Sequence, residues 1–402
     1  MPLSIEEKGR ECLAPEMDIV ELARDLIKCA SVTPMDAGAL DVLQKALESL
    51  GFICHRLPFG TSAEGKVDNL YARLGSEGPN FCYAGHTDVV PPGRITEWSH
   101  APFDASMENG FIYGRGAADM KGAIAAFVGA IKRFQTQCAT GGIKIPGSIS
   151  LLITGDEEGI AVNGTKRVLG WLAAKDETID HCLVGEPTNP ERIGDIIKIG
   201  RRGSLNAQVT VKGVQGHVAY PDVADNPISR LVKILMALTD HPLDAGTENF
   251  QPSNLEITSV DTGNETPNII PAAASARINI RFNNCHDGGS LAKWINDLCK
   301  AYAKDFDLDI HVSGEAFLTP PGELSKIVSE AIAAITGASP ELSTSGGTSD
   351  ARFIKDICPV IEFGLISRTM HKTDECVSIS DLKLLSDIYL SVLERYFLMP
   401  RT

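Results

Sequence analysis

Three short apolar segments of this chain each lead directly into acidic or histidine side chains. The segments, with the residues that follow them, are 80–84 with His86 and Asp88, 148–154 with Glu157 and Glu158, and 181–184 with Glu186. Each segment has the length of a buried strand, and helical patterns separate several of them along the chain. Such alternation predicts an α/β sheet covered by helices, in which sites form at the carboxyl ends of the strands. We therefore expect these side chains to meet at one edge of the sheet.

Helical periodicity occupies much of the sequence around these strands. Apolar residues recur at helical spacing after Asp18, which can cap a helix, and over residues 42–50, where Gly51 suits the position just past a helix end. Further segments are predicted as helices over 120–134, 165–174 and 385–396, and as a buried strand over 359–363. The sequence therefore predicts the α/β class, with helices flanking a central sheet.

The middle of the chain has a different pattern. Strands are predicted there over 205–211, 255–260 and 274–282, and a helix is predicted over 228–238. Alternation of apolar and polar residues predicts strands with one buried face, as in an antiparallel sheet with helices on one side. We therefore expect a small α+β domain, residues 203–315, inserted into a discontinuous larger domain of residues 1–202 and 316–402.

Charge and composition restrict the partners of the chain. It has 37 Lys and Arg against 52 Asp and Glu, a formal net charge of −15 at pH 7. Nucleic acids and anionic membranes attract basic surfaces, so neither is expected as a partner. No uncharged stretch approaches the ~20 apolar residues of a membrane span, and the first residues lack a signal-peptide pattern. The ten cysteines include no C-x-x-C pair and are expected to be reduced thiols, so a cytoplasmic protein is predicted.

Two further residues extend the candidate site. Asp119 lies at the start of the helix that follows GRGAAD, and His371 lies just beyond the strand predicted at 359–363. The five candidate metal ligands are then His86, Asp119, Glu158, Glu186 and His371. Imidazole and carboxylate ligands without thiolate suit Zn²⁺, and also Mn²⁺ or Co²⁺. Because five ligands exceed what one catalytic zinc uses, a bridging carboxylate would let two ions share them, roughly 3.5 to 4 Å apart.

Two acidic residues beside these ligands could assist them. Glu157 could act as a base toward a metal-bound water, and Asp88 could orient the ring of His86. Taken singly, a histidine at a strand end or an acidic run is more often an ordinary structural feature. The coincidence of three such strand ends at one edge favours the metal site.

Five ordered motifs give the chain a resemblance to a known family. They are GHTDVVPPG, GRGAADMKG, TGDEEG, VGEPT and TMHKTDE. They resemble the metal-site motifs of the M20 family of di-zinc peptidases and deacylases, and the resemblance runs from about Met17 to the C-terminus. It implies a di-zinc exopeptidase-like catalytic domain with a central mixed sheet flanked by helices, and an inserted ferredoxin-like domain that serves as lid and dimerisation domain. It also implies a cis peptide bond at Asp119–Met120.

The same resemblance assigns roles to the candidate residues. It implies that Asp119 bridges two ions, that His86 and Glu186 ligate one of them, and that Glu158 and His371 ligate the other. It also implies that Glu157 is the general base and acid and that Asp88 orients His86. The cofactor is expected to be two divalent metal ions, zinc first, with cobalt or manganese as alternatives.

Within the family, the chain is most similar to members that remove succinate from N-succinyl-L,L-2,6-diaminopimelate, a step of diaminopimelate and lysine synthesis. The segments that carry this similarity are IKIGRRGSLN, VKGVQGHVAYPDVADNP, TGNETPNIIP, GEAFLTPPG and STSGGTSDARF. By this resemblance His217 reaches the oxyanion from the lid of a partner subunit, so a homodimer through the lid is expected. The substrate is a small anion with three carboxylates, which arginine can bind bidentately. The substrate-binding candidates are Arg201, Arg202, Ser204, Tyr220, Asn268, Arg281, Gly347 and Thr348.

Two other functions remain as alternatives. One is an N-acetylornithine deacetylase or another aminoacylase of the same family. The other is a non-catalytic small-molecule-binding protein on the same scaffold, for which a missing ligand or base would be expected, whereas all seven positions carry competent residues. Residues 1–17 lie outside the family pattern, so Met17 is a candidate initiator.

Overall fold

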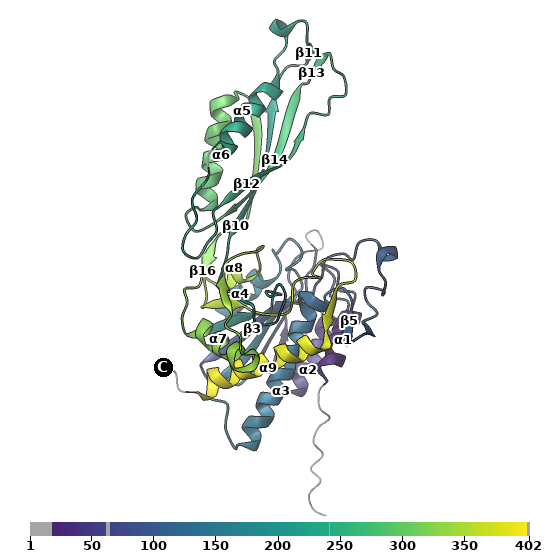
Figure 1. Cartoon of the computed structure of the whole chain (residues 1–402), viewed down its shortest axis with the longest axis vertical. Helices are drawn as coiled ribbons and strands as arrows, with labels where there is room; N and C mark the ends of the chain where they lie inside the picture. Colours follow the sequence, from purple (N-terminus) through teal and green to yellow (C-terminus); the bar gives the residue numbers. More distant parts are fainter. Residues whose placement is uncertain (1–17, 62–64, 241, 400–402) are drawn as a thin grey trace, which may run out of the picture.

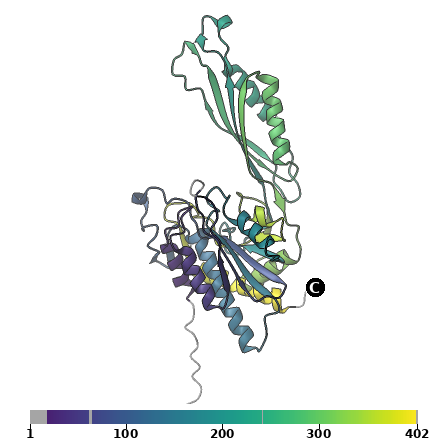
Figure 2. The same ribbon diagram turned by 180° about the vertical axis from the view of Figure 1, so that it is seen from behind.

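The chain forms two bodies joined by a narrow connection (Figures 1 and 2). The computed structural model describes residues 18–61, 65–240 and 242–399, and the extension predicted at residues 1–17 lies outside these ranges. The larger body contains the first and the last described elements, and the smaller body comes from the middle of the sequence. The smaller body is therefore an insertion into the larger one.

A mixed sheet of eight strands forms the centre of the larger body. Its strands, in spatial order, are β1 (Ile53–Arg56), β2 (Leu70–Leu74), β6 (Ser148–Thr154), β3 (Asn80–His86), β7 (His181–Val184), β18 (Val360–Glu362), β8 (Ile196–Lys198) and β17 (Glu341–Ser343). The neighbours β6, β3, β7 and β18 are parallel, whereas β1, β2 and β6 pair antiparallel. The four parallel strands are the ones predicted from the apolar segments, and the α/β fold class is confirmed.

Helices cover both faces of this sheet. Phe81 and Tyr83 of β3 pack into a core on one face, and Cys82 and Ala84 pack into a second core on the other. The first core includes side chains of α1 (Ile19–Lys28), α2 (Ala39–Ser49), α3 (Gly122–Thr140), α7 (Glu323–Thr336) and α9 (Ile379–Leu398). The second includes α4 (Thr165–Ala173) and α8 (Ala351–Ile354). Because both faces are covered, every residue of β3 and β6 is buried, and burial does not alternate along these strands.

Local sequence signals account for several helix ends. The Asp18 carboxylate accepts a hydrogen bond from the backbone N–H of Val20 at 2.8 Å and so caps α1. Gly51 follows α2 with a φ of 86°, a left-handed conformation that glycine adopts without strain. Helix α3 begins at Gly122, two residues later than predicted, because the preceding residues form the separate wide turn η2 (Ala117–Lys121). This turn carries Asp119.

The smaller body is an antiparallel sheet with two helices. Its strands, in spatial order, are β12 (Asn254–Asp261), β14 (Ala273–Phe282), β10 (Gly203–Lys212) and β15 (Phe306–Gly314), and its helices are α5 (Pro227–Thr239) and α6 (Gly288–Tyr302). The chain order is βαββαβ, the ferredoxin-like arrangement. Leu205 and Val209 are buried in a core of this body, whereas Gln208 between them is exposed. The predicted alternation along β10 is therefore confirmed.

Two elements of the smaller body, α6 and β15, are not among the predicted ones. Phe306, Leu308 and Ile310 of β15 alternate with polar residues, a signal that could have identified the strand, and they are only partly buried because β15 is an edge strand. We keep the division into residues 203–315 and the rest as a proposal. It is supported by the separate core of the smaller body.

Short elements complete the fold. They are β4 (Ser106–Glu108), β5 (Phe111–Tyr113), β9 (Gly200–Arg201), β11 (Gly216–His217), β13 (Ile269–Ile270), β16 (Phe317–Leu318), β19 (Cys376–Ser378), η1 (Ile95–Glu97) and η3 (Pro221–Val223). Among the described residues, no helix combines the length and apolarity needed to cross a membrane. The nine cysteines in these ranges are free thiols, and five of them are buried, as expected for small core side chains.

Replacing Ile234 by Ala should destabilise the smaller body. Ile234 of α5 is 0% exposed, and truncating it leaves a cavity that costs about 2 to 5 kcal/mol of the free energy of unfolding. Met236 on the same helix is 58% exposed, so Met236→Ala is the matched control, with an effect within about 0.5 kcal/mol. Urea unfolding curves measure both, and equal losses in the two variants would contradict the core assignment.

Candidate metal centre

The predicted strand ends meet at one edge of the large sheet. Strands β6, β3 and β7 are parallel neighbours, so their carboxyl ends lie side by side. His86 is the last residue of β3, Glu157 and Glu158 follow β6, and Glu186 follows β7. Strand pairing therefore brings together side chains that are far apart in the sequence.

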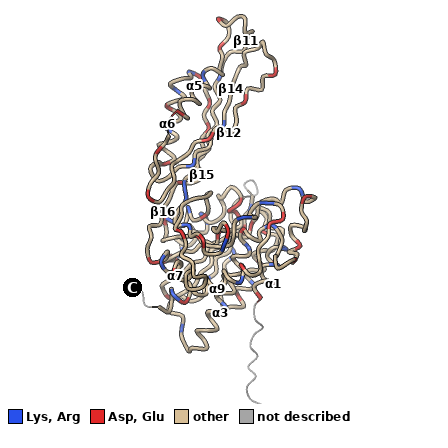
Figure 3. The backbone as a smooth tube through the Cα atoms, viewed as in Figure 1, with Lys and Arg blue, Asp and Glu red and all other residues tan. Residues whose placement is uncertain are grey.

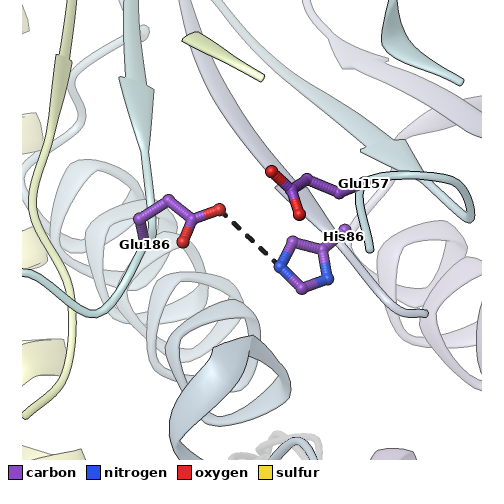
Figure 4. Close-up of side chains that lie close together, drawn as sticks. All are labelled: His86, Glu157 and Glu186. Atoms are coloured by element: carbon purple, nitrogen blue, oxygen red, sulfur yellow. Dashed lines mark ion pairs between the residues drawn. The ribbon is translucent and has the colours of Figure 1, made fainter. Parts of the chain in front are cut away.

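His86 faces carboxylates through one ring nitrogen. Its Nε2 lies 3.2 Å from Oδ1 of Asp119 and 3.6 Å from Oε1 of Glu186, and Figure 4 shows the Glu157 and Glu186 carboxylates directed toward the ring. Its Nδ1 lies 2.8 Å from the backbone carbonyl oxygen of Asp88. Since a carbonyl only accepts, Nδ1 carries a hydrogen in both protonation states of the ring. Nε2 therefore donates to the Asp119 carboxylate when the ring is protonated, and it can bind a cation when the ring is neutral. A cation between these atoms would satisfy both sides.

Asp119 links this group of side chains to a second group. Its Oδ2 lies 3.1 Å from Nε2 of His371, and the same nitrogen lies 2.8 Å from Oε1 of Glu158. The peptide bond between Asp119 and Met120 is cis, as the family resemblance implies. Each oxygen of the Asp119 carboxylate faces a different histidine, which is the arrangement that a bridging ligand requires.

Burial, charge and hydrogen bonds shift the pKa values of the side chains around Asp119. Burial alone would lower the pKa of His86, but its hydrogen bond with Asp119 and the surrounding negative charge raise that pKa well above its usual range. Hydrogen bonds with Asp119 and Glu158 raise the pKa of His371 to about 10. Burial, followed by the charge of Asp119, raises the pKa of Glu186 well above its usual range. The centre is therefore a concentration of negative charge that protons or metal ions must offset.

The donor atoms suit divalent cations. Two sets of three side chains, His86 with Glu157 and Glu186, and His86 with Asp119 and Glu158, each place donor atoms within 4.8 Å of one another. Imidazole nitrogen and carboxylate oxygen are the ligands that Zn²⁺, Mn²⁺ and Co²⁺ accept in proteins. Glu157 belongs to the first of these sets, so its carboxylate lies beside the candidate ligands His86 and Glu186.

Asp88 holds the segment that carries Glu157 and Glu158. Its carboxylate accepts their backbone N–H groups at 3.3 and 3.0 Å, and burial raises its pKa to about 6. The carboxylate lies 3.7 Å from Nδ1 of His86, whereas the Asp88 backbone carbonyl lies at 2.8 Å. The backbone carbonyl of Asp88 is thus the group that contacts the His86 ring, whereas the Asp88 carboxylate accepts hydrogen bonds from the loop that follows β6.

Three of the predicted residues lie far from this centre within the chain. His217 belongs to β11, Tyr220 follows it, and Asn268 immediately precedes β13. Strands β11 and β13 pair at the end of the smaller body that is remote from the larger one (Figure 1). The ring of His217 is exposed and lies 5.6 Å from the ring of Tyr220. One chain alone does not bring these residues to the candidate metal ligands.

Other predicted residues lie at the junction of the two bodies, where basic residues are visible in Figure 3. Arg202 donates a hydrogen bond to Oδ1 of Asn254 at 2.9 Å, and Arg281 is the register partner of Ser204 in the neighbouring strand. Burial and the nearby charge of Arg281 lower the pKa of Arg202. These two arginines are close enough to form a local positive patch.

Arg201 has an internal partner. It is buried, its Nε donates to Glu362 at 2.9 Å, and its terminal nitrogen pairs with the same carboxylate. The Ser349 hydroxyl also donates to Glu362, at 2.6 Å. The Arg201 guanidinium therefore ties the connection between the bodies to the loop that contains Gly347 and Thr348.

A cleft of about 930 Å³ lies beside Glu157 and Glu158. The larger body contributes Thr348 and Arg352 to its lining, and the smaller body contributes His311. Arg352 and His311 are not predicted from the sequence, although Arg352 lies within the motif STSGGTSDARF. A cleft between two bodies, lined by polar and charged groups, is a common place for a small-molecule site.

Known proteins are similar to this chain over most of its length. The model of peptidase family M20/M25/M40 matches residues 82–395. The succinyl-diaminopimelate desuccinylase of Rhodospirillum centenum is 58% identical over 96% of this chain and 99% of its own length. The protein of the same name from Parvibaculum lavamentivorans is 54% identical over 96% and 97%.

Solved structures share the fold at low sequence identity. An M20 family metallo-carboxypeptidase of Sulfolobus solfataricus has a TM-score of 0.76 at 19% identity, covering 95% of this chain and all of its own. A dinuclear metal-binding peptidase of the M20 family from Bacillus subtilis has a TM-score of 0.66 at 15% identity, covering 94% and 97%. The matched family model and the near-full-length relatives lead to one conclusion: the chain belongs to peptidase family M20/M25/M40.

Proposed function

We propose that the protein is a metal-dependent amide hydrolase that removes succinate from N-succinyl-L,L-2,6-diaminopimelate and releases L,L-2,6-diaminopimelate, for diaminopimelate and lysine synthesis. The observation that carries the proposal is the pair of ligand groups that share Asp119, with Glu157 beside them. The near-full-length relatives that bear the name of this activity support the choice of substrate. We expect such an enzyme to act in the cytoplasm.

Two divalent ions, zinc first and cobalt or manganese as alternatives, are the proposed cofactor. One ion would be held by His86, Asp119 and Glu186, and the other by Asp119, Glu158 and His371. Bound ions of this kind polarise an amide carbonyl and lower the pKa of a bound water to about 7.

Glu157 is the proposed proton carrier. Its carboxylate takes a proton from the attacking water as the new C–O bond forms, and then gives it to the amine nitrogen as the C–N bond breaks. The products are succinate and the free amine of diaminopimelate. Asp88 supports this step by holding the backbone N–H of Glu157 in place.

The substrate carboxylates need local positive charge, because the chain as a whole carries −15. Arg202 and Arg281, with Ser204 beside them, are proposed to bind one carboxylate at the junction of the bodies. Gly347 and Thr348 are proposed to contact the substrate from the larger body. Because Arg201 is paired with Glu362, we propose that it acts on substrate mainly by fixing the Gly347–Thr348 loop.

We further propose a homodimer through the smaller body. His217, Tyr220 and Asn268 lie at the remote end of that body, so they can serve a catalytic centre only if a second copy presents them. In that arrangement His217 of one protomer would donate a hydrogen bond to the oxyanion in its partner.

Glu157→Gln should leave both ions bound and lower kcat by a factor of about 10² to 10⁴, because it removes a proton carrier and no ligand. The neighbouring variant Glu158→Gln is the matched contrast and should lose metal. Metal content measured by atomic emission, together with kcat, separates the two. Equal loss of metal in both variants would make Glu157 a ligand and contradict the assigned role.

The purified protein should hydrolyse N-succinyl-L,L-2,6-diaminopimelate with a higher kcat/KM than N-acetylornithine. The physical reason is that the additional substrate carboxylates can pair with the arginines at the junction. Parallel assays of succinate and acetate release measure the ratio. A preference for N-acetylornithine would favour the deacetylase alternative, and no hydrolysis of either with added Zn²⁺ would favour a binding protein.

Mixing two inactive variants should restore activity if the dimer is as proposed. His217→Ala keeps its own metal centre but lacks the lid histidine, and Glu157→Gln keeps the histidine but lacks the base. Each heterodimer would contain one complete site, so a randomised equal mixture should recover about a quarter of the wild-type activity. Repeating the mixture with the double variant in place of Glu157→Gln is the control and should recover nothing. Full activity of a monomer would contradict the proposed homodimer.

A further inference from the structure

The loop that leads to Asp119 is held by a buried carboxylate from another part of the chain. Glu375 is 0% exposed. Its Oε2 accepts the backbone N–H of Gly116 at 3.1 Å, and its Oε1 accepts those of Ala118 and Asp119 at 3.0 and 3.1 Å. Three N–H groups around one carboxylate fix the backbone direction from which the Asp119 side chain departs.

Arg115 completes this anchor. Its NH1 donates to Oε2 of Glu375 at 2.7 Å and to the backbone carbonyl of Lys372 at 3.2 Å. Its NH2 donates to the backbone carbonyl of His371 at 3.5 Å. The guanidinium is 3% exposed and lies 5.2 Å from the centroid of the Trp98 ring. One buried ion pair therefore contacts the backbone at both Asp119 and His371.

The same two segments are also joined by backbone pairing. Gly114 N–H donates to the carbonyl oxygen of Glu375 at 2.8 Å. Strand β5, just before Gly114, pairs antiparallel with β19, just after Glu375. The segment that ends in Asp119 and the segment that begins at His371 are thus fastened side by side. Both oxygens of the Glu375 carboxylate already accept hydrogen bonds, so it is placed to hold the loop and not a metal ion.

We propose that Glu375 and Arg115 are positioning residues that set the distance between the Asp119 carboxylate and the His371 ring, and with it the metal affinity of the site formed by Asp119, Glu158 and His371. The proposal rests on the proposed function only in requiring two ions at the five ligands. Groups that orient metal ligands typically change metal affinity by about 10 to 100-fold when they are removed.

The two metal sites should respond unequally. His86 and Glu186 are positioned by the adjacent strands β3 and β7, and only Asp119 connects their site to the anchor. The other site draws two of its three ligands, Asp119 and His371, from the anchored segments. Loss of the anchor should therefore weaken one site much more than the other, whereas a general loss of stability would not distinguish them.

Glu375→Gln tests the proposal, because it keeps the shape of the side chain but removes its charge and places an amide NH₂ among N–H donors. Calorimetric titration of chelator-treated protein with Zn²⁺, repeated with Co²⁺, should show one ion bound near wild-type affinity and one weakened about 10 to 100-fold. Arg115→Lys keeps the charge without the planar fork and should show a smaller loss at the same site. Asp387→Asn is the control, since it removes the partner of Arg133 in an exposed ion pair, and should bind both ions normally.

Unfolding midpoints with and without metal separate positioning from folding. The increase in midpoint that metal produces should be smaller in Glu375→Gln than in the wild type. Two ions bound at wild-type affinity, with an equal drop in midpoint in both conditions, would overturn the proposal. If Glu375→Gln does not fold, wild-type metal affinities in Arg115→Lys would overturn it. A wild-type chain that binds fewer than two ions would contradict the proposed function instead.

Discussion

The shared carboxylate of Asp119 is the constraint on which the rest of the centre depends. Its two oxygens face two histidines, at 3.2 and 3.1 Å, and burial opposes the charge that it must carry. Hydrogen bonds with His371 and His86 outweigh that burial and hold the pKa of Asp119 below its usual range. A bridging ligand must remain ionised, so the surrounding imidazoles and the proposed cations serve the same electrostatic need.

Two buried acids outside the five candidate ligands accept backbone hydrogen bonds from the loops that carry some of those candidates. Asp88 accepts backbone N–H groups of Glu157 and Glu158, and Glu375 does the same for the loop that carries Asp119. A carboxylate that accepts several N–H groups fixes a loop more firmly than a neutral side chain would. The backbone around the candidate ligands Asp119 and Glu158 is therefore held by a second set of buried acids.

Short-range sequence patterns predict those strands and helices whose formation depends on interactions between residues close in sequence. The sequence predicts the parallel strands because each is a short apolar segment. The shared edge that bears His86, Glu158 and Glu186 follows from their parallel pairing. The sequence does not predict the ion-pair partners of Arg115 and Arg201, because a buried ion pair leaves no periodic signal. Arg115 and its partner Glu375, for example, are 260 positions apart. The sequence therefore predicts Arg201 as a substrate contact, whereas in the fold its guanidinium pairs with Glu362.

The two bodies are connected through a pair of short strands. The chain enters the smaller body after β9 and leaves it before β16, and these two short strands pair with each other. The opposite end of the smaller body carries the paired strands β11 and β13, and β11 contains His217. The pair of Arg201 and Glu362 lies at the base of this connection, next to the loop that contains Thr348. A displacement of the smaller body would therefore act on residues that line the cleft, and in the proposed homodimer closure around a substrate would draw on both protomers at once.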